Sequence, residues 1–188
     1  MIEVRIHGRG GQGNVVAAYL LATAAFNEGW HAQAFPAFGA ERRGAPVVAF
    51  VRLNDKPIRR RCQVAAPDFL IIQDEALLQV PGITEGLKPG GSILLNSTHS
   101  SEDFADSIKN NLVTLPATQL ATEHLGRPVP NTALLSAFIK LTGLLPQTSL
   151  SHALEERFKG EVLSKNIALI EAAATGLTAG LWQETANA

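Results

Sequence analysis

Cysteine is nearly absent from this chain of 188 residues, which contains only Cys62. A single thiol allows no disulfide within the chain. An iron–sulfur cluster usually takes about four cysteine thiolates, so the chain holds no such cluster by itself. Cys62 has no histidine close to it in the sequence, and it is expected to be a buried, inert thiol.

An excess of one charge is also missing, because 16 basic residues face 17 acidic ones and the net charge is −1. Nucleic-acid binders need a basic face for phosphates, so this balance argues against that class. No apolar run reaches the roughly 18 residues of a membrane span. The opening residues, MIEVRIHG, lack the apolar core of a signal peptide. We therefore expect a cytoplasmic protein that binds neither nucleic acid nor membrane.

Aromatic residues make up only 6% of the chain, while hydrophobic residues make up 46%. That hydrophobic content is ordinary for a soluble globular protein. The length suits one α/β domain, and two full domains would be cramped. Neither an internal repeat nor a linker divides the chain. The sequence therefore predicts a single domain spanning residues 1–188.

Strand-like and helix-like segments alternate, and the last third of the chain is helical. The patterns predict strands at residues 2–7, 30–35, 47–53, 69–73, 92–96 and 112–115. They predict helices at residues 14–27, 75–78, 101–108, 117–124, 131–142, 149–158 and 162–177. Residues 56–64, after a turn signal, are predicted to return antiparallel as a hairpin. The alternation predicts an α/β fold: a Rossmann-like three-layer domain with a mainly parallel sheet and a helical C-terminal region.

A glycine-rich turn joins the first predicted strand to the first predicted helix. Its glycines have the spacing Gly8-x-Gly10-x-x-Gly13. In such a turn Gly8 permits the tight bend, Gly10 lets the backbone approach a phosphate, and Gly13 lets the helix pack close to the strand. The helix N-terminus also favours an anion. The motif predicts a phosphate site, and the alternative is a turn that serves packing alone.

The acidic residue that would hold a nicotinamide ribose is missing. In dinucleotide sites an Asp or Glu ends the second strand, about 20 residues after the glycines. The second predicted strand here ends without one, and Glu41 comes too late and precedes the basic pair Arg42 and Arg43. The pattern therefore favours a phosphate-rich ligand other than a nicotinamide cofactor.

Three arginines are predicted to lie on one rim of the sheet. Arg9 is inside the glycine turn, and Arg42 and Arg43 follow the second strand, whose end shares the rim with that turn. Guanidinium groups suit phosphates and carboxylates. These residues are either an anion-binding cluster or a set of partners for Glu41 and for carboxylates of another chain. The run Arg59-Arg60-Arg61 is interpreted as a solvated or interface surface.

The other polar residues indicate no catalytic machinery. His7 ends the first strand and is expected to be structural, and the remaining histidines lack the spacing of metal ligands. The chain has neither a nucleophile-elbow motif nor a P-loop lysine motif. No catalytic or metal-binding residue is assigned.

The residues that carry these motifs resemble a known family. The stretches IHGRGGQGNVVAAYLLATAAFNEG and FPAFGAERRGAPVVAFVRL are similar to the gamma subunits of 2-oxoacid:ferredoxin oxidoreductases. Three later stretches are similar as well: PDFLIIQDEAL, PNTALLSAFIKLTGLL with Asn131 near its start, and FKGEVLSKNIALIEAA. The ERRGAPV form points to the pyruvate branch, while the oxoglutarate, isovalerate and indolepyruvate enzymes share the glycine loop.

The resemblance implies a role in a larger complex. Such a complex oxidatively decarboxylates a 2-oxoacid, forms acyl-coenzyme A and reduces ferredoxin or flavodoxin. Alpha, beta and delta-type subunits are the implied partners, and thiamine diphosphate, magnesium and 4Fe–4S clusters are implied to sit on them. The gamma-type chain is associated with coenzyme A, so Gly8, Gly10, Gly11, Gln12 and Gly13 are expected near its phosphates. From their charge, we expect Arg9, Arg42 and Arg43 to neutralise those phosphates.

Two further interpretations remain open. The chain is then either a structural subunit whose glycine turn and arginines only dock a partner, or a stand-alone nucleotide-binding enzyme of Rossmann type. The second needs a ribose-binding acid and a catalytic constellation, and the sequence offers neither. By itself the chain is expected to be inactive, because it has neither an electron carrier nor a thiamine-binding signature.

Overall fold

The structure is a computed structural model of the chain, and it describes residues 1–37 and 45–187. A six-stranded sheet forms its centre, in the order β2-β3-β1-β4-β5-β6. The strands are β1 (Ile2–Arg9), β2 (His31–Pro36), β3 (Pro46–Asn54), β4 (Phe69–Ile72), β5 (Ser92–Asn96) and β6 (Asn111–Leu115). Only β3 runs against its neighbours within the described residues. The predicted α/β fold with a mainly parallel sheet is thereby confirmed.

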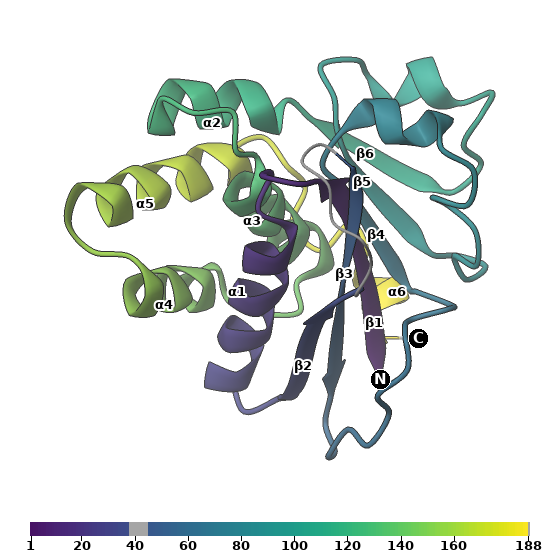
Figure 1. Cartoon of the computed structure of the whole chain (residues 1–188), viewed down its shortest axis with the longest axis horizontal. Helices are drawn as coiled ribbons and strands as arrows, with labels where there is room; N and C mark the ends of the chain where they lie inside the picture. The colour runs from purple at the N-terminus through teal and green to yellow at the C-terminus, as the bar shows by residue number, and fades with distance from the viewer. Residues whose placement is uncertain (38–44, 188) are drawn as a thin grey trace.

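The α-helices lie on one side of the sheet (Figure 1). They are α1 (Asn14–Asn27), α2 (Ala117–Leu125), α3 (Asn131–Thr142), α4 (Gln147–Arg157), α5 (Gly160–Ala174) and the short α6 (Gln183–Asn187). On the other side lie two short 3-10 helices, η1 (Glu75–Gln79) and η2 (Ser101–Phe104). The predicted helix at residues 101–108 is therefore wrong in type and length. None of the helices described is long and apolar enough to cross a membrane.

The predicted return strand at residues 56–64 is wrong. No strand occurs between β3 and β4, because β3 already pairs with β2 along one edge and with β1 along the other. The segment instead crosses the face of the sheet opposite the α-helices, where Gln33 Nε2 donates to Ile58 O at 3.2 Å. It carries Cys62, which is exposed, so the expectation of a buried thiol is also wrong.

The main core lies between the sheet and the α-helices. Side chains alternate between the faces of a strand, and Ile2, Val4 and Ile6 of β1 all point to this side. The most buried helix is α3, in which nearly every residue is inaccessible. Its Phe138 meets Phe69 of β4 edge-on, with ring centroids 5.2 Å apart. This contact ties the helical layer to the middle of the sheet.

The opposite face has an apolar half and a charged half. Over β4 and β5, Leu70, Ile72 and Ile93 pack against Leu77 of η1 and form a second, smaller core. Over β1 and β3, the alternation instead buries Glu3, Arg5, His7 and Arg52.

Two hydrogen-bonded arrangements hold the charged half together. Arg52 Nε donates to Glu3 Oε1 at 2.7 Å, and both side chains are buried. Arg5 Nη2 donates to the carbonyl oxygens of Ile83 and Glu85, at 3.0 and 2.7 Å. A buried charge is tolerated only when it is paired or hydrogen-bonded, so these contacts attach the loop before β5 to the sheet.

Replacing Phe69 by Ala tests the link between sheet and helices. Phe69 is fully buried and contacts both Phe138 and Trp182. We expect Phe69→Ala to lower the free energy of unfolding by about 3–5 kcal/mol, through lost burial and the cavity it leaves. Phe26→Ala is the matched control, because Phe26 is 70% exposed, and it should change stability by less than about 0.5 kcal/mol. Urea unfolding measures both, and equal stabilities would contradict the packing described.

Candidate functional site

The candidate site lies at the edge of the sheet where β1 and β4 end. From β1 the chain continues through α1 on the helical side, whereas from β4 it continues through η1 on the opposite side. Neighbouring parallel strands whose connections leave to opposite faces open a crevice at their carboxyl ends. The glycine turn of residues 8–13 lies at this edge, between the end of β1 and the start of α1.

The glycine turn is closed by its own hydrogen bonds. Gln12 N donates to Arg9 O at 3.1 Å, and Arg9 N donates to the side-chain oxygen of Gln12 at 2.6 Å. Gly10 N donates to Ala45 O at 3.1 Å, which joins the turn to the start of β3. The predicted ligand residue Gln12 therefore uses its side-chain oxygen to shape the loop.

Two of the glycines are required by close neighbours. A Cβ on Gly8 would clash with Oδ1 of Asn14, the first residue of α1. Gly13 has φ of 82°, and a Cβ there would lie 2.5 Å from Nδ2 of Asn131. Gly8 thus lets the helix start close to the strand, and Gly13 lets α3 approach the loop.

The N-termini of α1 and α3 meet at Gly13. The oxygen of Gly13 accepts the first hydrogen bond of α1, from Ala17 N at 2.8 Å, and also accepts from Asn131 Nδ2 at 3.3 Å. The amides of residues 14–16 come before that bond, so they have no acceptor within α1. Among the described residues, neither helix has an acidic residue in its first turn or a side-chain cap at its N-cap residue.

Two helix N-termini whose N-cap residues provide no side-chain cap create a positive region without the use of a charged side chain. The amide groups and the helix dipoles both favour an anion there. Asn131 Oδ1 accepts from Thr132 N at 2.9 Å, which leaves the Nδ2 group turned toward the loop. The arrangement suits a phosphate group held mainly by backbone amides.

Arg9 is held by a carboxylate at the end of β4. Its Nε lies 2.6 Å from Asp74 Oδ2, and both side chains are partly exposed, at 34% and 23%. The other oxygen of Asp74 accepts from Ala76 N at 3.0 Å and caps η1. The carboxylate therefore fixes the guanidinium beside the crevice. Arg42 and Arg43, predicted to join it, lie outside the described residues together with Glu41.

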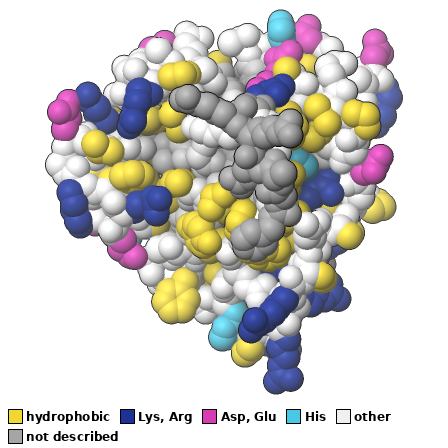
Figure 2. All heavy atoms as spheres, in the orientation of Figure 1, with side chains coloured by type: hydrophobic (Ala, Val, Ile, Leu, Met, Phe, Trp, Pro, Cys, Tyr) yellow, Lys and Arg dark blue, Asp and Glu magenta, His cyan; other side chains and the backbone are white. Residues whose placement is uncertain are grey.

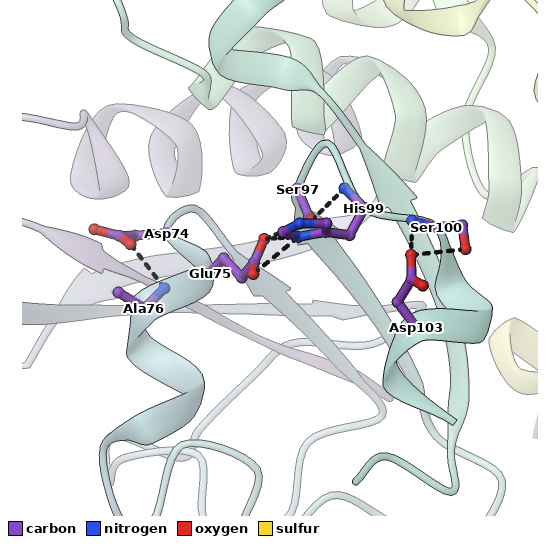
Figure 3. A network of polar contacts seen from close by, with 7 residues as sticks. All are labelled: Asp74, Glu75, Ala76, Ser97, His99, Ser100 and Asp103. Carbon is purple, nitrogen blue, oxygen red and sulfur yellow. Dashed lines mark hydrogen bonds and ion pairs between the residues drawn. The ribbon is translucent and has the colours of Figure 1, made fainter. Parts of the chain in front are cut away.

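A second polar network continues along the rim from Asp74 toward the end of β5 (Figure 3). Ser97 Oγ donates to Glu75 Oε2 at 2.5 Å, and Nδ1 of His99 lies 3.2 Å from each oxygen of Glu75. His99 N donates to Ser97 Oγ at 2.9 Å. Within residues 1–37 and 45–187, no group of three His, Cys, Asp or Glu is placed to hold a metal ion. The network joins the start of η1 to the residues that follow β5.

Beneath the turn, polar side chains are buried without partners. Both ring nitrogens of His7 and both side-chain polar atoms of Gln73 lack hydrogen bonds to any described residue. Burial, and secondly the nearby charge of Arg5, lower the pKa of His7 to about 4. His7 is therefore neutral at pH 7. Its role as a structural rather than catalytic residue stays a prediction.

Sequence reasoning assigned no site role to Asn14, Asp74 or Asn131. Asn14 follows the glycine motif directly and marks the helix start, so its place was visible in the sequence. Asn131 carried a weaker signal, as a polar residue opening an apolar helix. Asp74 follows a buried strand, where a carboxylate at the rim is a common site feature.

Known proteins resemble the chain over nearly its whole length. The family model described as pyruvate ferredoxin/flavodoxin oxidoreductase matches residues 3–176. The pyruvate/ketoisovalerate oxidoreductases common subunit gamma of Thermococcus kodakarensis is 48% identical over 92% of this chain and 95% of its own. The crystal structure of the pyruvate oxidoreductase subunit PORC of Thermotoga maritima has a TM-score of 0.82 and 35% identity, covering 92% of this chain and 94% of its own.

A more distant structure shares the fold. The 2-oxoglutarate:ferredoxin oxidoreductase of Magnetococcus marinus, with 2-oxoglutarate, coenzyme A and succinyl-CoA bound, has a TM-score of 0.74 and 24% identity. The match covers 95% of this chain and 32% of that one. The fold seen here therefore also occurs as one part of a longer polypeptide.

The lowered pKa of His7 predicts a loss of stability in acid. In the unfolded chain His7 becomes protonated as the pH falls below its usual pKa of 6.5. In the folded chain it stays neutral until the pH reaches about 4. The free energy of unfolding should therefore fall by about 3 kcal/mol more in the wild type than in His7→Gln as the pH drops from 6.5 to 4. Urea unfolding of both proteins across this range measures the difference. Parallel pH profiles would show that His7 is not buried in its neutral form.

Proposed function

The chain belongs to the pyruvate ferredoxin/flavodoxin oxidoreductase family as a gamma subunit, and from this membership we propose that its glycine loop binds the phosphate end of coenzyme A. In the proposed function the whole complex oxidatively decarboxylates a 2-oxoacid, forms acyl-coenzyme A and reduces ferredoxin or flavodoxin. A relative named for pyruvate and ketoisovalerate supports a 2-oxoacid of this kind.

One observation carries the proposal. The N-termini of α1 and α3 meet at Gly13, and their first turns lack acidic residues in the structure as described. Backbone amides that point at one place are suited to a phosphate oxygen. A 2-oxoglutarate:ferredoxin oxidoreductase that contains this fold has been seen with coenzyme A bound, which is in keeping with the proposal.

The proposed contribution of this chain is binding and orientation. With one cysteine it holds no cluster by itself. Thiamine diphosphate, its magnesium ion and the 4Fe–4S clusters are accordingly proposed to reside on alpha, beta and delta-type partner chains, where they supply decarboxylation and electron transfer. Coenzyme A held here by its phosphates would present its thiol to a partner chain. Holding two reactants in place removes much of the entropic barrier to their reaction.

The rim charges favour a second candidate function. Arg9 is paired with Asp74, and the partly exposed Glu75 is paired with His99. Partly exposed, paired charges of this kind suit contact with another protein. In this alternative the glycine loop only docks a partner subunit. The two functions differ in their use of the amides that follow Gly13, because only coenzyme A binding requires residues 14–16 to hold a phosphate.

Gly13→Ala in the reconstituted complex separates the two, with Gly29→Ala as the matched control. Both glycines have a positive φ, of 82° and 86°, so both substitutions carry similar backbone strain. Only the methyl group at Gly13 meets another group, Asn131, whereas that at Gly29 has no atom within 4 Å. We expect Gly13→Ala to raise the KM for coenzyme A by about tenfold or more, equivalent to about 1.4 kcal/mol of lost binding. Gly29→Ala should leave it unchanged.

Steady-state kinetics at varied coenzyme A, with size-exclusion chromatography of the complex, measure both effects. An unchanged KM in a fully assembled Gly13→Ala complex would refute the coenzyme A site. Loss of assembly in Gly13→Ala, but not in Gly29→Ala, would favour the docking function instead.

A further inference from the structure

The segment between β3 and β4 contains a thiol beside a buried guanidinium. Residues 55–63 of this segment are mostly exposed, and the side chain of Cys62 is open to solvent. Arg52 of β3 lies beneath it and is only 1% exposed. The distance from Arg52 Nη2 to Cys62 Sγ is 3.9 Å.

The guanidinium of Arg52 has hydrogen-bonding capacity left over. Its Nε donates to Glu3 Oε1 at 2.7 Å, and its Nη2 makes only the long contact to sulfur. Its Nη1 has no acceptor among the residues described. A buried N–H group without an acceptor is unfavourable, and a neutral thiol is a weak acceptor. The buried guanidinium can therefore donate to a further acceptor, such as an anionic oxygen.

The surroundings of the thiol are positively charged. Arg59, Arg60 and Arg61 precede Cys62 in the chain and are all exposed. Basic side chains gather at the lower end of the molecule in Figure 2, where Figure 1 places the segment after β3. Peroxides oxidise accessible cysteines, and positive charge nearby attracts the anionic oxygen that this oxidation adds to sulfur.

We propose that Cys62 is a reversible oxidation site, at which a hydroperoxide converts the thiol to a sulfenate that Arg52 binds. The thiolate attacks one peroxide oxygen, so that an S–O bond forms and the O–O bond breaks. The leaving hydroxide or alkoxide takes up the proton released by the thiol and departs as water or alcohol, and the sulfenic acid so formed gives its own proton to solvent to become the sulfenate. Sulfur is oxidised and the peroxide is reduced. The new oxygen then accepts hydrogen bonds from Arg52, including its Nη1 group.

A thiol reductant reverses the modification. It attacks the sulfenic acid to form a mixed disulfide and water, and a second thiol then releases Cys62 as the free thiol.

Oxidation of Cys62 also changes how firmly residues 55–63 are held against the sheet. Few contacts hold it to the sheet, among them Gln33 Nε2 to Ile58 O at 3.2 Å. A charge-assisted bond from Arg52 to the sulfenate fastens it more firmly.

The oxidation rate tests the proposal on the full-length chain, which has a single thiol. The chain is treated with hydrogen peroxide and dimedone, and adduct formation at Cys62 is followed by mass spectrometry. The control is Thr178→Cys in a Cys62→Ser background, since Thr178 is exposed and has no charged neighbour within four residues of the sequence. We expect the wild type to form the adduct about tenfold faster or more, because a hydrogen bond from the Arg52 guanidinium to the transferred oxygen lowers the barrier to its transfer. Equal rates would overturn the proposal.

Two variants distinguish the contribution of the buried guanidinium to the oxidation rate from that of the surface charges. Arg59→Gln/Arg60→Gln/Arg61→Gln keeps Arg52 and should retain most of the rate advantage, whereas Arg52→Lys should lose it. If Arg52→Lys does not fold, the triple variant decides alone. A fall of the triple variant to the rate of the control would overturn the role of Arg52.

Trypsin provides a structural measurement, because it cuts after Arg59, Arg60 and Arg61. Peroxide-treated wild type should be cut there several-fold more slowly than the reduced protein, and dithiothreitol should restore the original rate. Cleavage that does not change on oxidation would show that the sulfenate is not held by the sheet.

Discussion

The approach of α3 to the glycine turn is the constraint on which the candidate site depends. The carbonyl oxygen of Gly13 starts α1 by accepting from Ala17 and also receives the side chain of Asn131. The approach of Asn131 needs a residue without a Cβ, and the backbone at this position has a positive φ, which favours glycine. The same position therefore aligns α1 on the sheet, brings the start of α3 to the rim and leaves amides of residues 14–16 available. Packing and ligand binding are here two results of one backbone conformation.

The charged half of the opposite sheet face has a different function in the fold. Glu3 and Arg52 stand opposite each other in the β1–β3 ladder and form a buried ion pair. Such pairs often add little net stability, since desolvation offsets their attraction. A shift of one residue between the strands would turn these charges into the apolar core. The pair therefore specifies the register of β1 against β3 rather than adding much to stability.

The sequence predicted those elements whose ends are set by nearby residues. The helices at 14–27 and 131–142 begin and end as expected, one at the glycine turn and the other before Gly143 with its positive φ. The return strand at 56–64 was wrong because β3 finds its partners in β1 and β2, a choice made by distant residues. Asn131 could not be linked to Gly13 from spacing, since 118 residues separate them. The exposure of Cys62 was missed because it follows from the path of an irregular segment.

The central place of β1 has a consequence for the order of folding. The strand precedes both of its sheet neighbours along the chain, which are β3 and β4, and β4 ends at Ile72. Its apolar face is then covered by a core to which α3 contributes, far later in the chain. Contacts between segments so far apart in the chain close slowly, and the exposed edges are prone to wrong association meanwhile. One edge of β1 can therefore pair with β3 once residue 54 has been added, whereas its other edge waits for β4 and its apolar face waits for α3.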